Sequence, residues 1–267
     1  MKKILLTGAT GYIGKRMINV IAAQGYQVIC CCRDKNRFSK SVDIDDAQIE
    51  VVEVDFLKPE TLENIPKDIS GAYYLMHSMS NSNDYAESEK QCAINFSNYI
   101  EKTDCKHIIY LSGLANEKEL SEHLSSRFEV EKILMKCKVP ATVLRAGIII
   151  GSGSASFEII RDLVEKLPVM VAPKWLHTKC QPIGIANVLD FLIFTLFKEE
   201  AYHKSFDIGC NDVLTYKEML LEFAKIRGLK RKIFTVPVMT PKLSSYWLYF
   251  ITSTSYNLAS ALVGSMK

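Results

Sequence analysis

The sequence predicts an α/β fold in which a doubly wound parallel sheet is joined to a smaller C-terminal lobe. Two observations predict it. A short apolar stretch near the N-terminus runs directly into three glycines with the spacing G-x-x-G-x-x-G. Five or six apolar stretches of strand length then alternate with helix-like segments up to about residue 150, after which this rhythm changes. We expect the sheet domain over residues 1–150 and the lobe, interleaved with it, over residues 151–267.

The first strand is expected at Ile4–Leu6, and Gly8, Gly11 and Gly14 follow it. Gly8 allows a sharp turn, Gly11 lets a pyrophosphate approach the main chain, and Gly14 lets the next helix pack closely. Free N–H groups at the helix N-terminus then face the phosphates. A purely structural glycine turn is the alternative, but the preceding strand and the amphipathic segment that follows favour dinucleotide binding. The expected contacts in this loop are Thr7, Gly8, Thr10, Gly11, Tyr12, Ile13 and Gly14.

The second strand, Gln27–Cys32, predicts which dinucleotide is bound. The residue that closes this strand meets the adenosine ribose, where a carboxylate favours NAD and an arginine pairs with the 2′-phosphate of NADP. Arg33 holds that place, and Lys35 and Arg37 follow closely. We therefore expect NADP, with NAD less favoured; Asp34 would take the acidic role if the strand ended one residue later.

The later strands place further candidates at one edge of the sheet, because open parallel sheets bind ligands beyond the carboxyl ends of their strands. The third strand, 49–55, ends at Asp55 and Phe56, which we expect beside the adenine. The fourth, 71–76, runs into His77. The fifth, 107–111, delivers Ser112, and a sixth is expected at 141–146.

The part of the chain after residue 150 predicts a helix followed by a loop over 163–173 and a short strand over 206–209. Thr215 and Glu218 have the spacing of a helix capping box. Near the C-terminus, the aromatic-rich stretch Tyr246–Ile251 is too short and too interrupted to span a bilayer. We expect a helix there that packs on the lobe or on a partner, with a membrane-surface contact as the alternative.

Composition excludes several other classes of protein. A net charge of +3 is too small to predict nucleic-acid binding. Cys30, Cys31 and Cys32 are consecutive in an apolar strand and no C-x-x-C pair occurs, so we expect reduced thiols and no metal site. Too few apolar residues precede Gly8 for a signal peptide. We expect a cytoplasmic protein without a transmembrane segment, for which a homodimer is compatible with the sequence.

These motifs resemble those of the short-chain dehydrogenase/reductase superfamily, in its extended and atypical branches. The resemblance rests on the glycine loop, Asp55, Ser112 and the run Arg145-Ala146-Gly147. Three further runs are similar to the atypical NAD(P)H-binding subgroup related to NmrA-like and epimerase-like proteins: 73–79, 151–158 and 167–170. The resemblance implies a Rossmann fold over essentially the whole chain. Members of that subgroup often continue into a further C-terminal domain, so this chain is expected to be a short member or part of a longer protein.

The sequence departs from this superfamily at its catalytic motif. Active members carry Tyr-x-x-x-Lys on the helix after the fifth strand; the tyrosine exchanges a proton with the substrate and the lysine holds the nicotinamide ribose. Here the matching positions are His123 and Arg127. Residues four apart share a helix face, and a histidine titrates near neutrality, whereas an arginine cannot act as a base. An ordinary polar helix face is the alternative, and other candidate proton donors are Tyr73, Tyr74, His77 and His177.

The motifs therefore leave two alternative functions. The first is an NADP-dependent oxidoreductase or epimerase-like enzyme acting on an unidentified small carbonyl or alcohol. Ser112 would orient the substrate oxygen, His123 would supply the proton, and Arg127 would hold the ribose. The second is a non-catalytic NADP(H)-binding sensor or regulatory protein, in which the altered motif no longer supports turnover.

Overall fold

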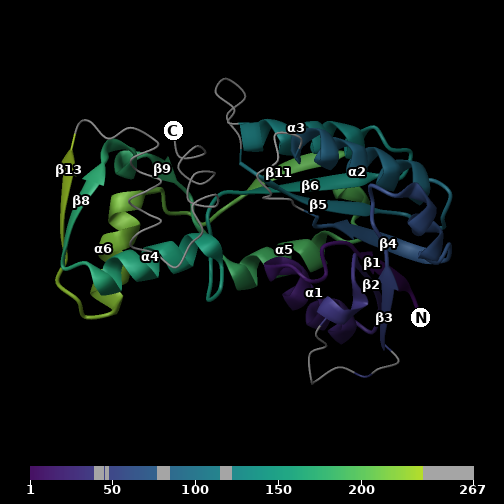
Figure 1. The fold of residues 1–267 in the computed structure, drawn as a ribbon, viewed down its shortest axis with the longest axis horizontal. Helices are drawn as coiled ribbons and strands as arrows, with labels where there is room; N and C mark the ends of the chain where they lie inside the picture. Colours follow the sequence, from purple (N-terminus) through teal and green to yellow (C-terminus); the bar gives the residue numbers. More distant parts are fainter. Residues whose placement is uncertain (39–44, 46–47, 77–84, 115–121, 237–267) are drawn as a thin grey trace.

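The computed structural model of the protein describes residues 1–38, 45, 48–76, 85–114 and 122–236. Among them, seven parallel strands form one central sheet. Figure 1 shows helices α2 and α3 on one face of this sheet, α1 and α5 on the other, and a smaller lobe beyond one end. The expected doubly wound α/β fold is confirmed. In sheet order the strands are β11 (Lys204–Ile208), β6 (Ala141–Ala146), β5 (Ile108–Gly113), β4 (Ile69–Tyr74), β1 (Lys3–Leu6), β2 (Gln27–Cys32) and β3 (Ile49–Glu53).

Both faces of the sheet are buried, which explains the continuous apolar character of its strands. Alternate residues of a strand point to opposite faces. In β1, Leu5 accordingly packs in the apolar cluster under α2 and α3, whereas Ile4 and Leu6 pack in the cluster over α1 and α5. The four covering helices are α1 (Tyr12–Ala23), α2 (Tyr85–Ile100), α3 (Glu122–Met135) and α5 (Ile185–Thr195).

The short strand expected over 206–209 is β11, and it joins the large sheet as a seventh strand, which corrects both its expected place in the lobe and the expected count of five or six. It lies at the sheet edge and pairs in parallel with β6, from Lys204 opposite Thr142 to Ile208 opposite Ala146. Its sequence is half polar because an edge strand has one neighbour and stays partly exposed, so it lacks the apolar run of the inner strands. Residues after 150 thus supply one strand and one helix of the large sheet domain, and a boundary at residue 150 stays a prediction.

The small lobe is built on a third apolar cluster, which α4 (Ala155–Lys166) and α6 (Tyr216–Ile226) cover. The loop expected after the helix is wrong: residues Val169–Pro173 form strand β8, which pairs in parallel with β13 (Lys232–Val236). The partner of β8 lies some sixty residues later, so no local pattern announces it. The shorter elements are η1 (Lys35–Arg37), η3 (Pro59–Asn64), β7 (Ile149–Ile150), η4 (Lys174–His177), β9 (Lys179–Cys180), β10 (Ile183–Gly184), η5 (Glu199–Ala201) and β12 (Leu214–Thr215).

Two local features of the lobe are clear. The capping box is confirmed, since Thr215 Oγ1 accepts a hydrogen bond from the Glu218 N–H and the Glu218 carboxylate accepts one from the Thr215 N–H.

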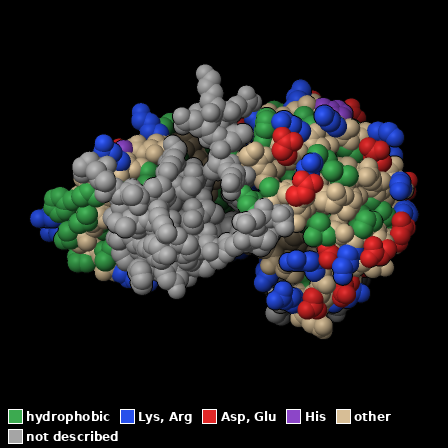
Figure 2. Space-filling view, turned by 45° about the horizontal axis from the view of Figure 1, so that its top comes forward, with side chains coloured by type: hydrophobic (Ala, Val, Ile, Leu, Met, Phe, Trp, Pro, Cys, Tyr) green, Lys and Arg blue, Asp and Glu red, His purple; other side chains and the backbone are tan. Residues whose placement is uncertain are grey.

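The outer face of the β8–β13 pair exposes Val169, Val171 and Phe234. Figure 2 shows this apolar patch at the far end of the lobe, whereas basic and acidic side chains intermix over the large domain. The aromatic-rich stretch 246–251 lies outside the described residues.

Candidate functional site

The glycine turn after β1 is sterically closed to other residues. Gly8 has a left-handed φ of +67°, and a Cβ there would lie 2.5 Å from the carbonyl oxygen of Leu75. A Cβ on Gly14 would lie 2.1 Å from the Gly8 carbonyl oxygen. Helix α1 starts after Gly11, which has no side chain to cap it, and its first turn holds no acidic residue. The first N–H groups of α1 are therefore left for an anion, as a pyrophosphate site requires.

The side chain of Thr7 does not take part in this site, which corrects the expectation for its hydroxyl. Thr7 is fully buried, and its Oγ1 donates to the Tyr73 carbonyl oxygen at 3.1 Å and accepts from the Leu75 N–H at 2.9 Å. The hydroxyl therefore fastens β1 to β4. Thr10, three residues later, has an exposed side chain in the turn. Contacts of Thr10, Tyr12 and Ile13 with a nucleotide stay predictions.

A contact between this turn and the start of the lobe was not expected from the sequence. The Arg16 guanidinium lies 4.0 Å from the ring centroid of Tyr12 and donates to the Ser152 carbonyl oxygen at 2.9 Å. Tyr12 Oη is buried without a hydrogen-bond partner among the described residues, and burial raises the pKa of Tyr12. A Cβ on Gly151 would lie 2.5 Å from that oxygen. The glycine-rich run 151–153 is the signal that a side chain packs closely against the main chain here.

Arg33 lies where the sequence places it, directly after β2, and its side chain is exposed. The competing Asp34 is engaged locally, because its carboxylate accepts a hydrogen bond from the Asn36 N–H at 2.9 Å and caps the short helix η1. Lys35 and Arg37 are exposed beside it. This corner of the sheet therefore presents three cations, and the carboxylates of Asp34 and Glu53 there each accept a hydrogen bond from the main chain.

Strand β3 ends at Glu53, two residues earlier than expected, and of the two residues predicted beside the adenine one differs from the expectation. Asp55 is half-buried, and its carboxylate accepts a hydrogen bond from the Leu57 N–H at 3.1 Å. Phe56 is buried in the core, with its ring centroid 6.0 Å from that of Phe96 on α2. Its side chain is therefore not available to an adenine, which corrects the expected role of Phe56. Leu57 is the apolar side chain exposed at this strand end.

Ser112 and Arg127 come together at the carboxyl end of β5. Ser112 is the penultimate residue of the strand, which runs two residues further than expected, and it is buried. The guanidinium of Arg127 lies over the next residue, since a Cβ on Gly113 would be 2.8 Å from Arg127 Nη1. Desolvation lowers the pKa of Arg127, while Tyr110 and Glu89 act against that shift. A half-buried cation thus stands at the strand end where the family resemblance predicts a ribose-binding residue.

The candidate proton donors are distributed differently from the expectation. His123 belongs to α3, but its side chain, like His77, lies outside the described residues. Tyr73 and Tyr74 are core residues: both are buried, burial raises the pKa of each, and Tyr73 Oη donates to the Leu192 carbonyl oxygen. His177 lies in the lobe, with Nε2 3.3 Å from Thr235 Oγ1. Tyr73 and Tyr74 are therefore wrong as donor candidates.

Two buried polar contacts fix the helix that carries Arg127. The Glu131 carboxylate accepts hydrogen bonds from Arg145 Nε at 3.0 Å and from Ser205 Oγ at 2.8 Å, which ties α3 to β6 and β11. Ser126 Oγ donates to the Glu89 carboxylate on α2. Charged groups with this little exposure need such partners. Neither contact was expected from the sequence, although Arg145 belongs to one of the family-like runs.

Two further observations bound the chemistry of the site. All eight cysteines are free thiols, and the described residues hold no group of three or more His, Cys, Asp or Glu side chains arranged to bind a metal ion. None of the described helices combines the length and the apolar character that crossing a bilayer requires.

The sequence of this chain is similar to those of known proteins. The model of the NmrA-like family matches residues 1–239. Photosystem II assembly factor Ycf39 of Trieres chinensis is 22% identical over 249 residues, which cover 91% of this chain and 74% of that protein. The chloroplastic divinyl chlorophyllide a 8-vinyl-reductase of Arabidopsis thaliana is 23% identical over 257 residues. That match covers 88% of this chain and only 60% of the reductase.

Solved structures share the fold over nearly the whole chain. A nucleoside-diphosphate-sugar epimerase of Staphylococcus aureus has a TM-score of 0.76 at 14% identity, covering 100% of this chain and 88% of that one. An NADPH-dependent quinone oxidoreductase of Escherichia coli in complex with NADPH has a TM-score of 0.75 at 18% identity, covering 98% and 87%. A short-chain dehydrogenase/reductase superfamily protein of Agrobacterium tumefaciens with bound NAD has a TM-score of 0.70 at 12% identity, covering 99% and 96%. These structures show the shared fold; among them, one holds NADPH and another holds NAD.

Proposed function

This chain belongs to the NmrA-like family, and from that premise we propose that it is an NADP(H)-dependent oxidoreductase acting on a small carbonyl or alcohol. One observation carries the proposal. The glycine turn after β1 and the pair Ser112 and Arg127 at the carboxyl end of β5 lie at the same edge of the sheet, with only β4 between strands β1 and β5. A dinucleotide laid along this edge would meet main-chain N–H groups at its pyrophosphate and a cation at its nicotinamide ribose.

The residues present fit such a cofactor. Gly8, Gly11 and Gly14 offer bare main chain, and Arg33 is exposed at the strand end that would meet the adenosine ribose. Asp34, the group that would favour NAD, already accepts a hydrogen bond from its own loop. Because the guanidinium of Arg33 suits a phosphate monoester, these features favour the 2′-phosphate of NADP.

The chemistry divides between the cofactor and the chain. The nicotinamide supplies or accepts a hydride when bound. The residues of this chain would then bind and orient the substrate: Ser112 at its oxygen, and Arg127 at the ribose hydroxyls. We assign the proton to His123, because it lies one helical turn before Arg127 on α3. Arg127, as a permanent cation, holds the ribose and takes no part in proton transfer.

Titration of NADPH and NADH against the parent protein and an Arg33→Ala variant tests the cofactor assignment. The variant should bind NADPH about tenfold to a hundredfold more weakly, since a charge-assisted hydrogen bond contributes about 1.5–3 kcal/mol. NADH affinity should stay unchanged, and Arg227→Ala, which removes an exposed arginine of the lobe, should change neither. Equal affinity of the parent protein for the two cofactors would exclude the NADP assignment.

A non-catalytic NADP(H)-binding regulator is the second candidate. The altered His-x-x-x-Arg motif favours it, and so does the similarity to a protein named as an assembly factor. A panel of carbonyl substrates separates the two functions. The enzyme requires NADPH oxidation that falls sharply in His123→Gln, whereas the regulator requires intact NADPH binding with no turnover on any of them.

A further inference from the structure

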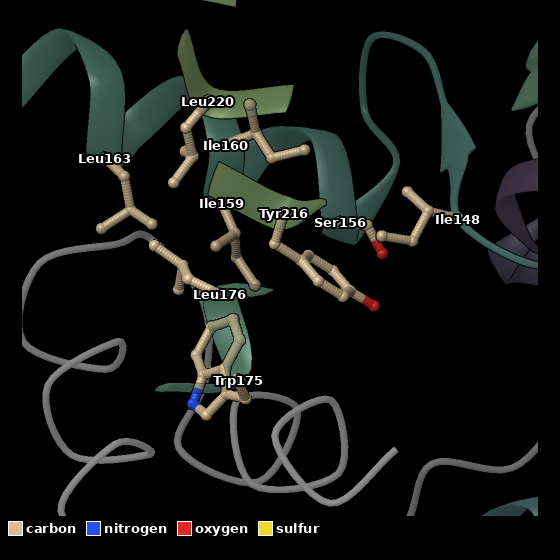
Figure 3. A pocket seen from close by; sticks show the side chains of 9 residues that line it. All are labelled: Ile148, Ser156, Ile159, Ile160, Leu163, Trp175, Leu176, Tyr216 and Leu220. Atoms are coloured by element: carbon tan, nitrogen blue, oxygen red, sulfur yellow. The ribbon is translucent and has the colours of Figure 1, made fainter. Parts of the chain in front are cut away.

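The small lobe contains an apolar pocket between α4, η4 and α6 (Figure 3). It has an empty volume of about 410 Å³, part of it continuous with solvent. Leu163 and Trp175 lie at one end, and Ile148 lies at the other. None of the nine side chains that line the pocket is charged. Among the described residues a diphosphate therefore finds no cation there, which disfavours a nucleotide sugar as the occupant of this pocket.

Two hydroxyl groups stand at the Ile148 end of the pocket. In Figure 3 the hydroxyls of Tyr216 and Ser156 both lie on that side. The Tyr216 ring packs edge-to-face on Trp175 with 5.8 Å between the ring centroids, which fixes its position. Burial raises the pKa of Tyr216, so its phenol stays protonated at neutral pH. The pocket thus combines an apolar interior with a hydrogen-bond donor at one end.

The hydroxyl end adjoins the candidate active site. Ile148 follows β6 by two residues, and the last residue of that strand, Ala146, accepts a hydrogen bond from the Leu114 N–H at 2.9 Å. Leu114 in turn directly follows Ser112 and Gly113 at the end of β5. A molecule in the pocket that extended past Ile148 would therefore reach the sheet edge where the cofactor is proposed to lie.

We propose that this pocket binds a slim alkyl or alkenyl group of an uncharged substrate, with Tyr216 donating a hydrogen bond to an oxygen next to that group. The group must be slim, because the empty volume of about 410 Å³ includes space that is open to solvent, so the enclosed part of the pocket is smaller. The identification of the ligand as substrate rests on the proposed function. The binding itself does not, since it needs no cofactor and no turnover.

A series of methyl ketones from 2-butanone to 2-nonanone measures the pocket, with affinities determined by ligand-observed NMR. Affinity should rise about fourfold with each added methylene, the usual gain for burying one, and level off once the pocket is full. Affinity that does not depend on chain length in the parent protein would overturn the proposal. Competition between UDP-glucose and the ketones would also overturn it.

Two neighbouring leucines of α6 provide matched variants. Leu220 lines the pocket and is 4% exposed, whereas Leu221 is 37% exposed. Leu220→Trp should fill the pocket and abolish the dependence on chain length, and Leu221→Trp should retain it. An unchanged dependence in Leu220→Trp would place the ketones elsewhere.

A second variant keeps the proposal testable if Leu220→Trp does not fold. Tyr216→Phe keeps the ring and removes only the hydroxyl, so it should weaken every ketone by the same factor of about three to ten without changing the gain per methylene. Unchanged affinities in this variant would remove Tyr216 from its role. NADPH titration of the same variants distinguishes the two proposals. A variant that binds NADPH as the parent does but has lost the ketone response tests the pocket alone, whereas failure of the parent protein to bind NADPH contradicts the proposed function and not the pocket.

Discussion

Two groups of polar atoms, one at the amino ends of the central strands (the amino edge) and one at their carboxyl ends (the carboxyl edge), differ in how completely they are paired. At the amino edge, His107 Nδ1 accepts a hydrogen bond from the Phe197 N–H, and its Nε2 lies 2.9 Å from Thr142 Oγ1. Thr142 Oγ1 donates onward to the Ala201 carbonyl oxygen. At the carboxyl edge, in contrast, Tyr12 Oη lacks a partner among the described residues, and the first N–H groups of α1 have no side-chain cap.

This difference indicates that the amino ends of the strands contribute to the stability of the fold, whereas their carboxyl ends are available to bind a ligand. A network that is fully paired within the protein contributes to the folded state and offers nothing to a ligand. Groups left open at the other edge cost stability until a ligand satisfies them. Changes at the amino edge should therefore alter unfolding with little effect on cofactor affinity, and changes at the carboxyl edge should alter affinity.

The largest effect is expected from two glycines at opposite edges. Gly14→Ala places a Cβ 2.1 Å from main-chain oxygen, so the turn has to open. We expect a loss of more than about 4 kcal/mol in unfolding free energy, together with loss of NADPH binding. Gly25, which precedes β2 at the amino edge, has a left-handed φ of +77° and open space around it. Gly25→Ala should cost only about 1–2 kcal/mol and keep NADPH binding. Urea unfolding and NADPH titration measure both, and similar losses in the two variants would contradict the comparison.

Acid should next destabilise the amino edge through His107. This side chain is fully buried, and burial lowers its pKa from 6.5 to about 4. Below pH 6.5 the unfolded chain binds a proton that the folded protein excludes, so stability should fall from about pH 6.5 and level off below about pH 4. The gap between the two pKa values corresponds to about 3 kcal/mol.

His107→Gln is the variant that isolates this term. It should be less stable than the parent at pH 7.5, because Gln does not reproduce both ring contacts, and it should lose less stability on acidification. Unfolding measured by urea at pH 7.5, 5.5 and 4.5 gives the difference between the two proteins. An identical pH dependence would show that His107 has the same pKa in the folded and the unfolded protein.

A smaller effect, on affinity, is expected from Arg127 at the carboxyl edge. Arg127→Met keeps the length of the side chain and removes the cation beside Gly113, so NADPH should bind about tenfold more weakly. The unfolding free energy of Arg127→Met should fall less than its free energy of NADPH binding does, since the variant no longer keeps a charge in a partly buried place. Lys132→Met, an exposed change on the same helix, should leave NADPH affinity as it is. Equal affinities for all three proteins would separate Arg127 from the cofactor.

The smallest effect, and one of opposite sign, is expected at Tyr12. Tyr12→Phe removes a buried hydroxyl that has no partner among the described residues, so the ligand-free protein should gain about 1 kcal/mol in unfolding free energy. Tyr73→Phe removes a buried hydroxyl that donates to the Leu192 carbonyl oxygen and should lose about as much. Thermal unfolding compares the two. A loss of stability in Tyr12→Phe would mean that its hydroxyl is paired after all.

Several features of the site follow from residues that are neighbours in the chain. The glycine turn, Arg33 at the end of β2 and the capping box at Thr215 all depend on a few consecutive residues, and the structure places each where the pattern indicates. Other features depend on distant partners. Arg16 donates a hydrogen bond to the carbonyl oxygen of Ser152, which lies 136 residues further along the chain. Strand β11 completes the large sheet although it follows several elements of the lobe in the chain. No local pattern carries that information.

The sequence by itself determined the α/β fold with its parallel sheet and the position of the glycine turn, because main-chain sterics and strand periodicity act within a few residues. Only the tertiary structure decided which side chains remain available there. Thr7 and Phe56 stand at the expected strand ends, yet one hydroxyl bonds to β4 and one ring packs against α2. Whether a polar or apolar group is free depends on what the rest of the chain brings against it, and that is settled by packing between elements far apart in sequence.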